Sequence, residues 1–251
     1  MSVPRVCAHR GATDERPEQT MLAYSRAVEL GADTVELDVR LTADQQLAVF
    51  HDATLERTTN GSGRVGAMSL AEVRKLDTGS WFDARFFAST VPTVPQVLEF
   101  AESASIDLCI EVKAESPQEA LETAGVLAET LSSHGALGEH LISSFDMGAL
   151  SAVRSNFPNA RLLPWMPEDR PPDVAEHLEV SRLLQAEGVF HTASLLTAAH
   201  VREIQDAGLA VWVWSSDDPS ELAHAYSLKP DVVSAGSVAS NLAVRSKASA
   251  T

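Results

Sequence analysis

Two segments of the sequence combine carboxylates with an alternating apolar pattern. In segment 35–40, valine and leucine alternate with Glu36, Asp38 and a final arginine, and a later segment repeats the pattern and ends in Glu111 and Lys113. Successive side chains of a strand point to opposite faces, so the apolar residues share one face and the charged residues the other. If helices cover the apolar faces, the carboxylates point inward, where water is scarce and a cation is needed to stabilise them.

The ligand chemistry of these carboxylates indicates a hard divalent cation. Glu36, Asp38 and Glu111 offer only oxygen ligands, which suit Mg²⁺ or Ca²⁺ rather than zinc. The alternative is a buried network of ion pairs in which Lys113 and Arg40 neutralise the carboxylates. We favour metal binding, because the charged residues fall at the carboxyl ends of their strands, where barrel enzymes build their sites.

Two histidines accompany the carboxylates. His9 and Arg10 follow the first expected strand, and His51 follows the apolar run 47–50 that closes the second strand region. Cleavage of a phosphodiester needs a base to activate the attacking oxygen and an acid to protonate the leaving alkoxide, and histidine can do either. Arginine offers a fork that fits phosphate oxygens, and Lys113 can neutralise charge developing on phosphorus.

Short apolar runs alternate with helical patterns along the whole chain. We expect strands near residues 6–9, 34–40, 106–112, 140–143, 161–163, 188–192, 210–214 and 232–234. Helical patterns cover residues 20–30, 117–134, 147–156, 198–207 and 219–228, with a weaker one at 173–179. Repeated strand–helix alternation predicts parallel strands joined by crossover helices. Because the 251 residues match the ~250 of one (β/α)₈ barrel, we predict a single α/β domain, a TIM barrel over residues 1–251.

The stretch 53–93 interrupts this alternation. It contains the glycine-rich turn 60–63 and the aromatic run 81–87. An excursion after the second strand predicts a small capping insertion over the barrel mouth, at about residues 54–90. The aromatic run has two interpretations, a wall of the substrate site or the miniature core of the insertion itself.

The composition limits the partners and the compartment. With 19 Lys+Arg against 35 Asp+Glu, the formal net charge of −16 repels nucleic acid and anionic membrane surfaces. We therefore expect neither a nucleic-acid partner nor stable membrane association. No secretory leader and no apolar run long enough to cross a bilayer are present, so we expect a cytoplasmic protein. In a reducing compartment, Cys7 and Cys109 are expected to be free thiols.

The same motifs resemble those of the glycerophosphodiester phosphodiesterase family. The similarity is most specific up to Lys113 and looser beyond, where Ser143-Ser144-Phe145 and the strand of Trp212 look like later elements of the family. The similar segments in the first part are 9–11 (His-Arg-Gly), 17–20 (Pro-Glu-Gln-Thr), 31–39, 51–52, 55–59, 76–79, 91–93 and 110–113.

The resemblance implies a set of site residues on a metal-binding barrel. The implied metal ligands, for one Mg²⁺ or Ca²⁺, are Glu36, Asp38 and Glu111. The implied catalytic pair is His9 and His51. Substrate contacts are implied for Arg10, Lys113 and Trp212, with phosphate held by the first two.

Three positions depart from the family pattern. Gln19 stands where the family usually has asparagine, Ser215 replaces another asparagine, and Ala235 replaces an aspartate. Trp214 fills space that a smaller residue would leave open at the mouth. None of these changes removes a catalytic group, but they bear on substrate preference.

The expected function is metal-dependent hydrolysis of a glycerophosphodiester to glycerol phosphate and an alcohol, with a small-molecule substrate. Two alternatives remain. One is a lysophospholipase D-like enzyme of the same fold, which needs a wide apolar slot for an acyl chain. The other is a non-catalytic barrel that binds phosphodiesters, although such a protein has no use for an acid–base pair.

Overall fold

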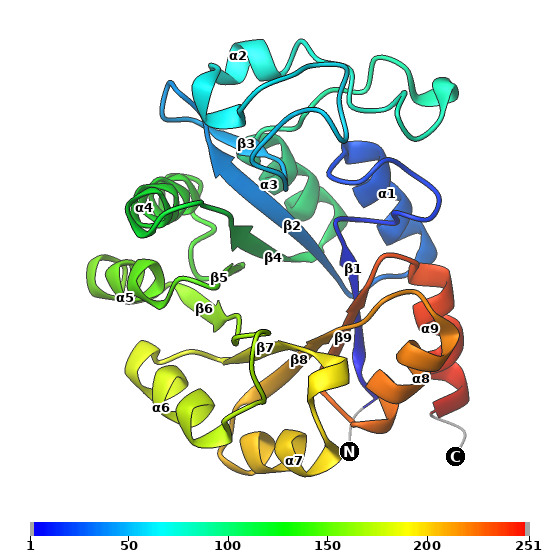
Figure 1. Ribbon diagram of the computed structural model, residues 1–251, viewed down its shortest axis with the longest axis vertical. Helices are drawn as coiled ribbons and strands as arrows, with labels where there is room; N and C mark the ends of the chain where they lie inside the picture. Colours follow the sequence, from blue (N-terminus) through cyan, green and yellow to red (C-terminus); the bar gives the residue numbers. More distant parts are fainter. Residues whose placement is uncertain (1–2, 249–251) are drawn as a thin grey trace.

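The computed structural model describes residues 3–248, in which eight parallel strands form a nearly closed barrel (Figure 1). The strands follow one another in the order β6-β5-β4-β2-β1-β9-β8-β7, and a parallel bridge between Trp165 and Phe190 joins the two ends. This arrangement confirms the predicted (β/α)₈ fold. The strands are β1 Arg5–His9, β2 Thr34–Leu41, β4 Asp107–Val112, β5 Leu141–Ser144, β6 Arg161–Pro164, β7 Gly188–Thr192, β8 Ala210–Trp214 and β9 Val232–Ala235.

Helices surround the strands and cover their outer faces (Figure 1). They are α1 Met21–Leu30, α3 Val94–Ala104, α4 Pro117–Ser133, α5 Met147–Asn156, α6 Val174–Leu184, α7 Ala198–Asp206, α8 Pro219–Ser227 and α9 Val238–Ala248. Several helices begin at an N-cap residue. The hydroxyls of Thr20 and Ser116, for example, accept backbone N–H groups at the starts of α1 and α4. The sequence patterns above included neither α3 nor α9, although Thr93 and Gln96 form a capping box at the start of α3.

The two faces of the strands have different environments. The outward residues of β2 and β4, such as Val35, Leu37 and Ile110, pack in the layer between strands and helices. The barrel interior has an apolar part, to which most of the strands contribute, and a charged part at the carboxyl ends of β1, β2 and β4. The buried residues of the apolar part are Cys7, Cys109, Leu141, Leu163, Trp165, Phe190, Trp212 and Val232. Both cysteines are buried free thiols, as expected.

A hairpin after β2 changes the path of the chain. Beyond Leu41 the chain turns back as β3 (Leu47–Val49), which pairs antiparallel with the end of β2. The N–H group of Phe50 then donates to the carbonyl of Asp38 at 3.0 Å. His51 is therefore not at the end of a barrel strand. It returns to the mouth because the hairpin folds back.

The segment between β3 and α3 lies over one side of the barrel (Figure 1). It contains η1 Val65–Ala67, α2 Leu70–Val73 and η2 Ala84–Phe86. Its buried cluster is mainly aliphatic and is made of Ala48, Phe50, Leu55, Val65, Val73 and Val91. The aromatic run is not this core: Trp81 and Phe87 are exposed, by 41% and 74%. Between residues 3 and 248, no helix is both long and apolar enough to cross a membrane.

Candidate active site

Three carboxylates meet inside the mouth of the barrel. Glu36 and Asp38 lie on the inward face of β2, and Asp38 is directly opposite Glu111 of β4 in the parallel register. All three are buried, with exposures of 0%, 0% and 2%. One oxygen from each lies within 4.8 Å of the others, so the three can contact a single cation. The strand alternation read from the sequence therefore produces the expected convergence.

The hydrogen bonds of these carboxylates leave oxygens open for a cation. Glu36 Oε2 accepts the N–H of Arg10 at 3.1 Å, and Asp38 Oδ2 accepts from the amide of Gln19 at 2.5 Å. The second oxygens, Glu36 Oε1 and Asp38 Oδ1, are buried and accept no hydrogen bond within the described chain. Glu36 Oε1 has no donor and Asp38 Oδ1 is near only the Lys113 ammonium at 3.3 Å, an arrangement that fits a hard divalent cation.

The pKa shifts of the three carboxylates also indicate that the cluster could accept a cation. Burial, with repulsion from Asp38 and Glu111, raises the pKa of Glu36 well above its ordinary value. Burial and Asp38 likewise raise the pKa of Glu111 to about 7. Burial also acts on Asp38, but Lys113 and Arg10 outweigh it and hold the pKa of that carboxyl below its ordinary value. The two protein cations thus compensate only part of the negative charge, and a divalent cation would compensate the rest.

Lys113 and Arg10 are the two cations that the fold brings to the carboxylates. The Lys113 ammonium lies 2.5 Å from Glu111 Oε1 and 3.3 Å from Asp38 Oδ1. Arg10 Nε lies 3.1 Å from Asp38 Oδ2. Both side chains are about four-fifths buried yet reach the mouth, with exposures of 18% and 17%. They are the basic groups that lie beside the three carboxylates at the mouth.

The position of Arg10 depends on the glycine that follows it. Gly11 has φ +93°, and a Cβ atom there would lie only 2.5 Å from the Cβ atom of Ala23 in α1. A side chain at this position is excluded by both the backbone conformation and the close approach. The loop after β1 therefore stays tight against α1, and the N–H of Arg10 stays on Glu36.

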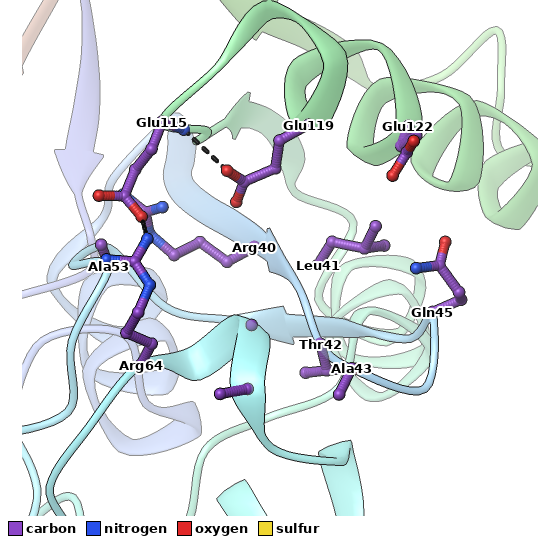
Figure 2. A pocket seen from close by; sticks show the side chains of 12 residues that line it. Arg40, Leu41, Thr42, Ala43, Gln45, Ala53, Arg64, Glu115, Glu119 and Glu122 are labelled. Carbon is purple, nitrogen blue, oxygen red and sulfur yellow. Dashed lines mark hydrogen bonds and ion pairs between the residues drawn. The ribbon is translucent and has the colours of Figure 1, made fainter.

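Arg40 does not belong to this cluster, contrary to the ion-pair alternative. Its Nε donates to the backbone carbonyl of His51 at 2.7 Å. Its guanidinium lies in a separate cavity of about 480 Å³ between the β2–β3 hairpin, the insertion and α4 (Figure 2). In the view of Figure 2, Arg64 meets Glu115 there, and Glu119 accepts the N–H of Glu115 at 2.9 Å. Arg40 thus holds the backbone of His51 through this hydrogen bond and does not contact the three carboxylates.

His9 ends β1 and faces the carboxylates. Its Nε2 atom lies 3.8 Å from Glu36 Oε2, and its ring meets the indole of Trp214 edge-on at a centroid distance of 6.0 Å. Burial, together with the charge of Arg10, lowers the pKa of His9 to about 3. The imidazole is therefore neutral near pH 7 and can accept a proton at a nitrogen.

His51 is held by a carboxylate that the sequence analysis did not single out. Its Nδ1 atom lies 2.5 Å from Asp52 Oδ1. Arg57 holds both oxygens of Asp52, at 2.6 and 2.9 Å, and lowers the pKa of Asp52 below its ordinary value. Since an ionised carboxylate only accepts, Nδ1 must carry the proton and Nε2 is left for chemistry.

Arg57 also connects the insertion to the loop after β1. Its two Nη atoms donate to the two oxygens of Glu18, each at 2.8 Å. Glu18 in turn accepts from Arg10 Nη1 at 3.2 Å. Asp52, Arg57 and Glu18 all lie in motifs seen in the sequence, yet only the folded chain shows that they connect His51 with Arg10.

Of the three residues that depart from the family pattern, only Gln19 contacts a carboxylate of the site. Gln19 is 4% exposed and contacts Asp38 directly. Ser215 is buried and donates to the carbonyl of Ser216 at 3.1 Å. Ala235 packs in the apolar layer between strands and helices, so its side chain does not face the mouth.

Aromatic side chains form the opposite wall of the barrel interior. Trp214 is at the mouth, beside His9, whereas Trp212 lies one layer deeper, is 5% exposed and packs on Phe190. Phe145 is exposed, stacks on Trp165 and lies 5.9 Å from the Lys113 ammonium. The contact of Trp212 with substrate stays a prediction, and Trp214 is the indole that meets the His9 ring.

These features define a class: a (β/α)₈ barrel whose mouth combines three buried carboxylates, which could hold a cation, with two histidines and two basic residues. The sequence model of the glycerophosphoryl diester phosphodiesterase family matches residues 9–234. The chain belongs to this family, which confirms the resemblance seen in its motifs.

Relatives and solved structures agree with this assignment. A glycerophosphodiester phosphodiesterase of Bacillus subtilis is 37% identical over 174 residues, covering 62% of this chain and 58% of the relative. The matches to the first curated relatives span only 44 to 62% of their lengths.

Two solved structures share nearly the whole fold. A phosphodiesterase of Oleispira antarctica, in complex with the product sn-glycerol-3-phosphate, has a TM-score of 0.87 and 28% identity, covering 96% of both chains. A glycerophosphodiester phosphodiesterase of Agrobacterium tumefaciens has a TM-score of 0.80 and 30% identity, covering 96% of this chain and 99% of that one.

Proposed function

We propose that this protein is a phosphoric diester hydrolase that cleaves glycerophosphodiesters to glycerol phosphate and an alcohol. The observation that carries the proposal is the convergence of His9 and His51 on one cluster of buried carboxylates and cations. Family membership supports it, as does the solved phosphodiesterase that binds sn-glycerol-3-phosphate as its product.

The carboxylates Glu36, Asp38 and Glu111 would hold one divalent cation, Mg²⁺ or Ca²⁺. The bound cation would supply Lewis-acid stabilisation of the phosphate oxygens. The open oxygens and the incompletely compensated charge support this assignment.

The protein's own cations would hold the phosphate against this site. Arg10 offers guanidinium hydrogens and Lys113 an ammonium group, and both already lie beside Asp38. Their charge is in place before the reaction, so they can stabilise negative charge that develops on the phosphoryl oxygens without reorganising. Binding of phosphate would replace part of their present pairing with carboxylates.

The two histidines would move the protons. One accepts the proton of the attacking oxygen and the other donates to the leaving alkoxide. Asp52 would fix the tautomer of His51, so that Nε2 is free to exchange a proton. His9 is kept neutral by its surroundings, and its ring packs edge-on against Trp214.

The test is turnover of glycerophosphocholine by metal-stripped protein, with and without added Mg²⁺ or Ca²⁺. We expect glycerol phosphate and choline to appear only with the metal. His134→Ala, at the exposed end of α4, is a matched control for His9→Ala and should keep full activity. Binding without turnover in the presence of both metals would favour the non-catalytic barrel instead.

A further inference from the structure

Two residues outside the carboxylate cluster form a buried chain of hydrogen bonds that ends on Asp38. The hydroxyl of Tyr24, in α1, donates to Gln19 Oε1 at 2.6 Å, and Gln19 Nε2 donates to Asp38 Oδ2 at 2.5 Å. Tyr24 is fully buried and Gln19 is 4% exposed. We propose that Tyr24 and Gln19 are positioning residues that orient Asp38 toward the bound cation; this rests on the metal site proposed above.

The direction of the chain follows from what each group can donate. Asp38 is held ionised by Lys113 and Arg10, so it can only accept, and the amide must present its nitrogen to it. The amide oxygen then faces Tyr24 and accepts the phenolic proton. Burial and the nearby Glu36 raise the pKa of Tyr24 well above its ordinary value, so the hydroxyl keeps this proton. The tyrosine thereby prevents the Gln19 side-chain amide from rotating by 180° and exchanging its oxygen and nitrogen.

The consequence concerns the two oxygens of Asp38. Oδ2 is occupied by Gln19 and by Arg10 Nε at 3.1 Å. Oδ1 is buried, accepts no hydrogen bond in the described chain and faces Lys113 at 3.3 Å. Holding one oxygen fixes the plane of the carboxylate and leaves the other directed into the cluster, which is how residues around a metal orient its ligands.

The backbone of Gln19 supports the same function. Its φ of +57° lies in the left-handed region, which a residue other than glycine seldom adopts. The N–H of Gln19 donates to the carbonyl of Arg10 at 3.1 Å, which ties the conformation to the loop that also carries the phosphate-binding arginine. Six other non-glycine residues of the described chain share this conformation, so what distinguishes Gln19 is this tie to the loop of Arg10.

The sequence provides a matched control, because it contains just two tyrosines. Tyr226 in α8 is also buried and also donates to an amide oxygen at 2.6 Å, that of Asn241. The amide of Asn241, however, donates to the carbonyl of Val233 and contacts no carboxylate of the site. Tyr24→Phe and Tyr226→Phe therefore remove the same kind of hydrogen bond at the same distance, one connected to Asp38 and one not.

The experiment is calorimetric titration of metal-stripped protein with CaCl₂ and with MgCl₂. Removing an outer-shell partner of a metal ligand lowers metal affinity by roughly 10–100-fold, so we expect Kd to rise on this scale for Gln19→Leu and Tyr24→Phe. Tyr226→Phe should keep the wild-type Kd. The double variant Gln19→Leu/Tyr24→Phe should be no weaker than Gln19→Leu alone, because the tyrosine acts through the amide.

Thermal unfolding in EDTA separates positioning from folding. If Tyr24→Phe and Tyr226→Phe lose similar stability but only the former loses metal affinity, the proposal stands. Equal Kd values for wild type, Gln19→Leu and Tyr24→Phe would overturn the positioning function and leave the metal site intact. Wild-type protein that binds neither ion would overturn the metal site itself, and this proposal with it.

Discussion

His51 Nδ1 and Asp52 Oδ1 lie 2.5 Å apart, although the two residues are neighbours in the sequence. Their side chains can meet because the chain turns sharply after β3, and Arg57 then holds the carboxylate from the other side. The pair resembles the histidine–carboxylate partnership of many hydrolases, in which the carboxylate selects the tautomer of the imidazole.

Replacing Asp52 with asparagine should lower kcat much more than it changes KM. The neutral amide no longer enforces a proton on Nδ1, so part of the population carries the wrong tautomer. The expected loss is ~10²–10⁴-fold, the scale of general acid–base catalysis. Steady-state kinetics with glycerophosphocholine measures it, with Asp83→Asn at the surface of the insertion as control. An Asp52→Asn enzyme with wild-type kcat would show that the contact has no catalytic importance.

The two histidines should behave as a unit. His9→Ala and His51→Ala are each expected to lower kcat by ~10²–10⁴-fold. If both residues act on one transition state, the double variant should be far more active than the product of the two losses predicts. Single-turnover measurements at saturating metal test this. Full turnover by either single variant would remove that histidine from the mechanism.

Without metal, Glu111 should make the stability of the protein depend on pH. Its folded-state pKa of about 7 is above the ordinary value of 4.5, so its contribution is fully present below pH 4.5 and is lost as pH rises toward 7 and above. Glu111→Gln mimics the protonated form. In EDTA, the two proteins should unfold alike near pH 4.5, and the variant should be more stable at pH 8, by at most ~3 kcal/mol.

Saturating Ca²⁺ or Mg²⁺ should reverse this order at pH 8. The wild type then gains the free energy of metal binding, whereas the variant has lost one ligand and gains less. Taking the difference between two proteins at each pH cancels the opposite trend caused by His9, whose pKa is lowered. Unfolding curves in urea with EDTA or metal provide the measurement. A wild type that is more stable than the variant at pH 8 in EDTA would contradict the unfavourable burial of Glu111 beside Asp38.

Trp214 should restrict the substrate. Its indole lies against His9 and narrows the mouth, so soluble deacylated diesters should be better substrates than lysophospholipids. We expect a higher kcat/KM for glycerophosphocholine than for lysophosphatidylcholine below its micellar concentration. Trp214→Thr should widen the range of accepted alcohols and leave the metal requirement unchanged. A preference of the wild type for the lysolipid would replace the substrate assignment with a lysophospholipase D-like one.

Much of this protein could be derived from its sequence because the fold repeats one local rule. Strand–helix alternation predicts a parallel barrel, and a period of two places Glu36 and Asp38 on the face opposite Val35 and Leu37. Once the strands are parallel, the carboxyl end of each lies at the same mouth. The meeting of Glu36, Asp38 and Glu111 therefore follows from pattern and topology alone.

Contacts that depend on loops could not be derived in this way. His51 reaches the mouth through an antiparallel hairpin, and Arg57 joins Asp52 to Glu18, which lies 39 positions before Arg57 in the sequence. The order of the residues sets neither distance, because loop conformation is decided by packing against the barrel. Arg40 is a further example. Strand alternation places it on the same face of β2 as Asp38, yet its long side chain bends away and donates to the carbonyl of His51.

Gln19 shows the division most clearly. By sequence it is a departure from a family motif, and its amide has no predictable partner. In the folded protein its left-handed backbone and the buried hydroxyl of Tyr24 give that amide one orientation, toward Asp38. The sequence alone determined which chemical groups line the mouth. The tertiary structure decided which hydrogen bonds orient them, because those bonds join residues whose approach depends on the packing of the entire barrel.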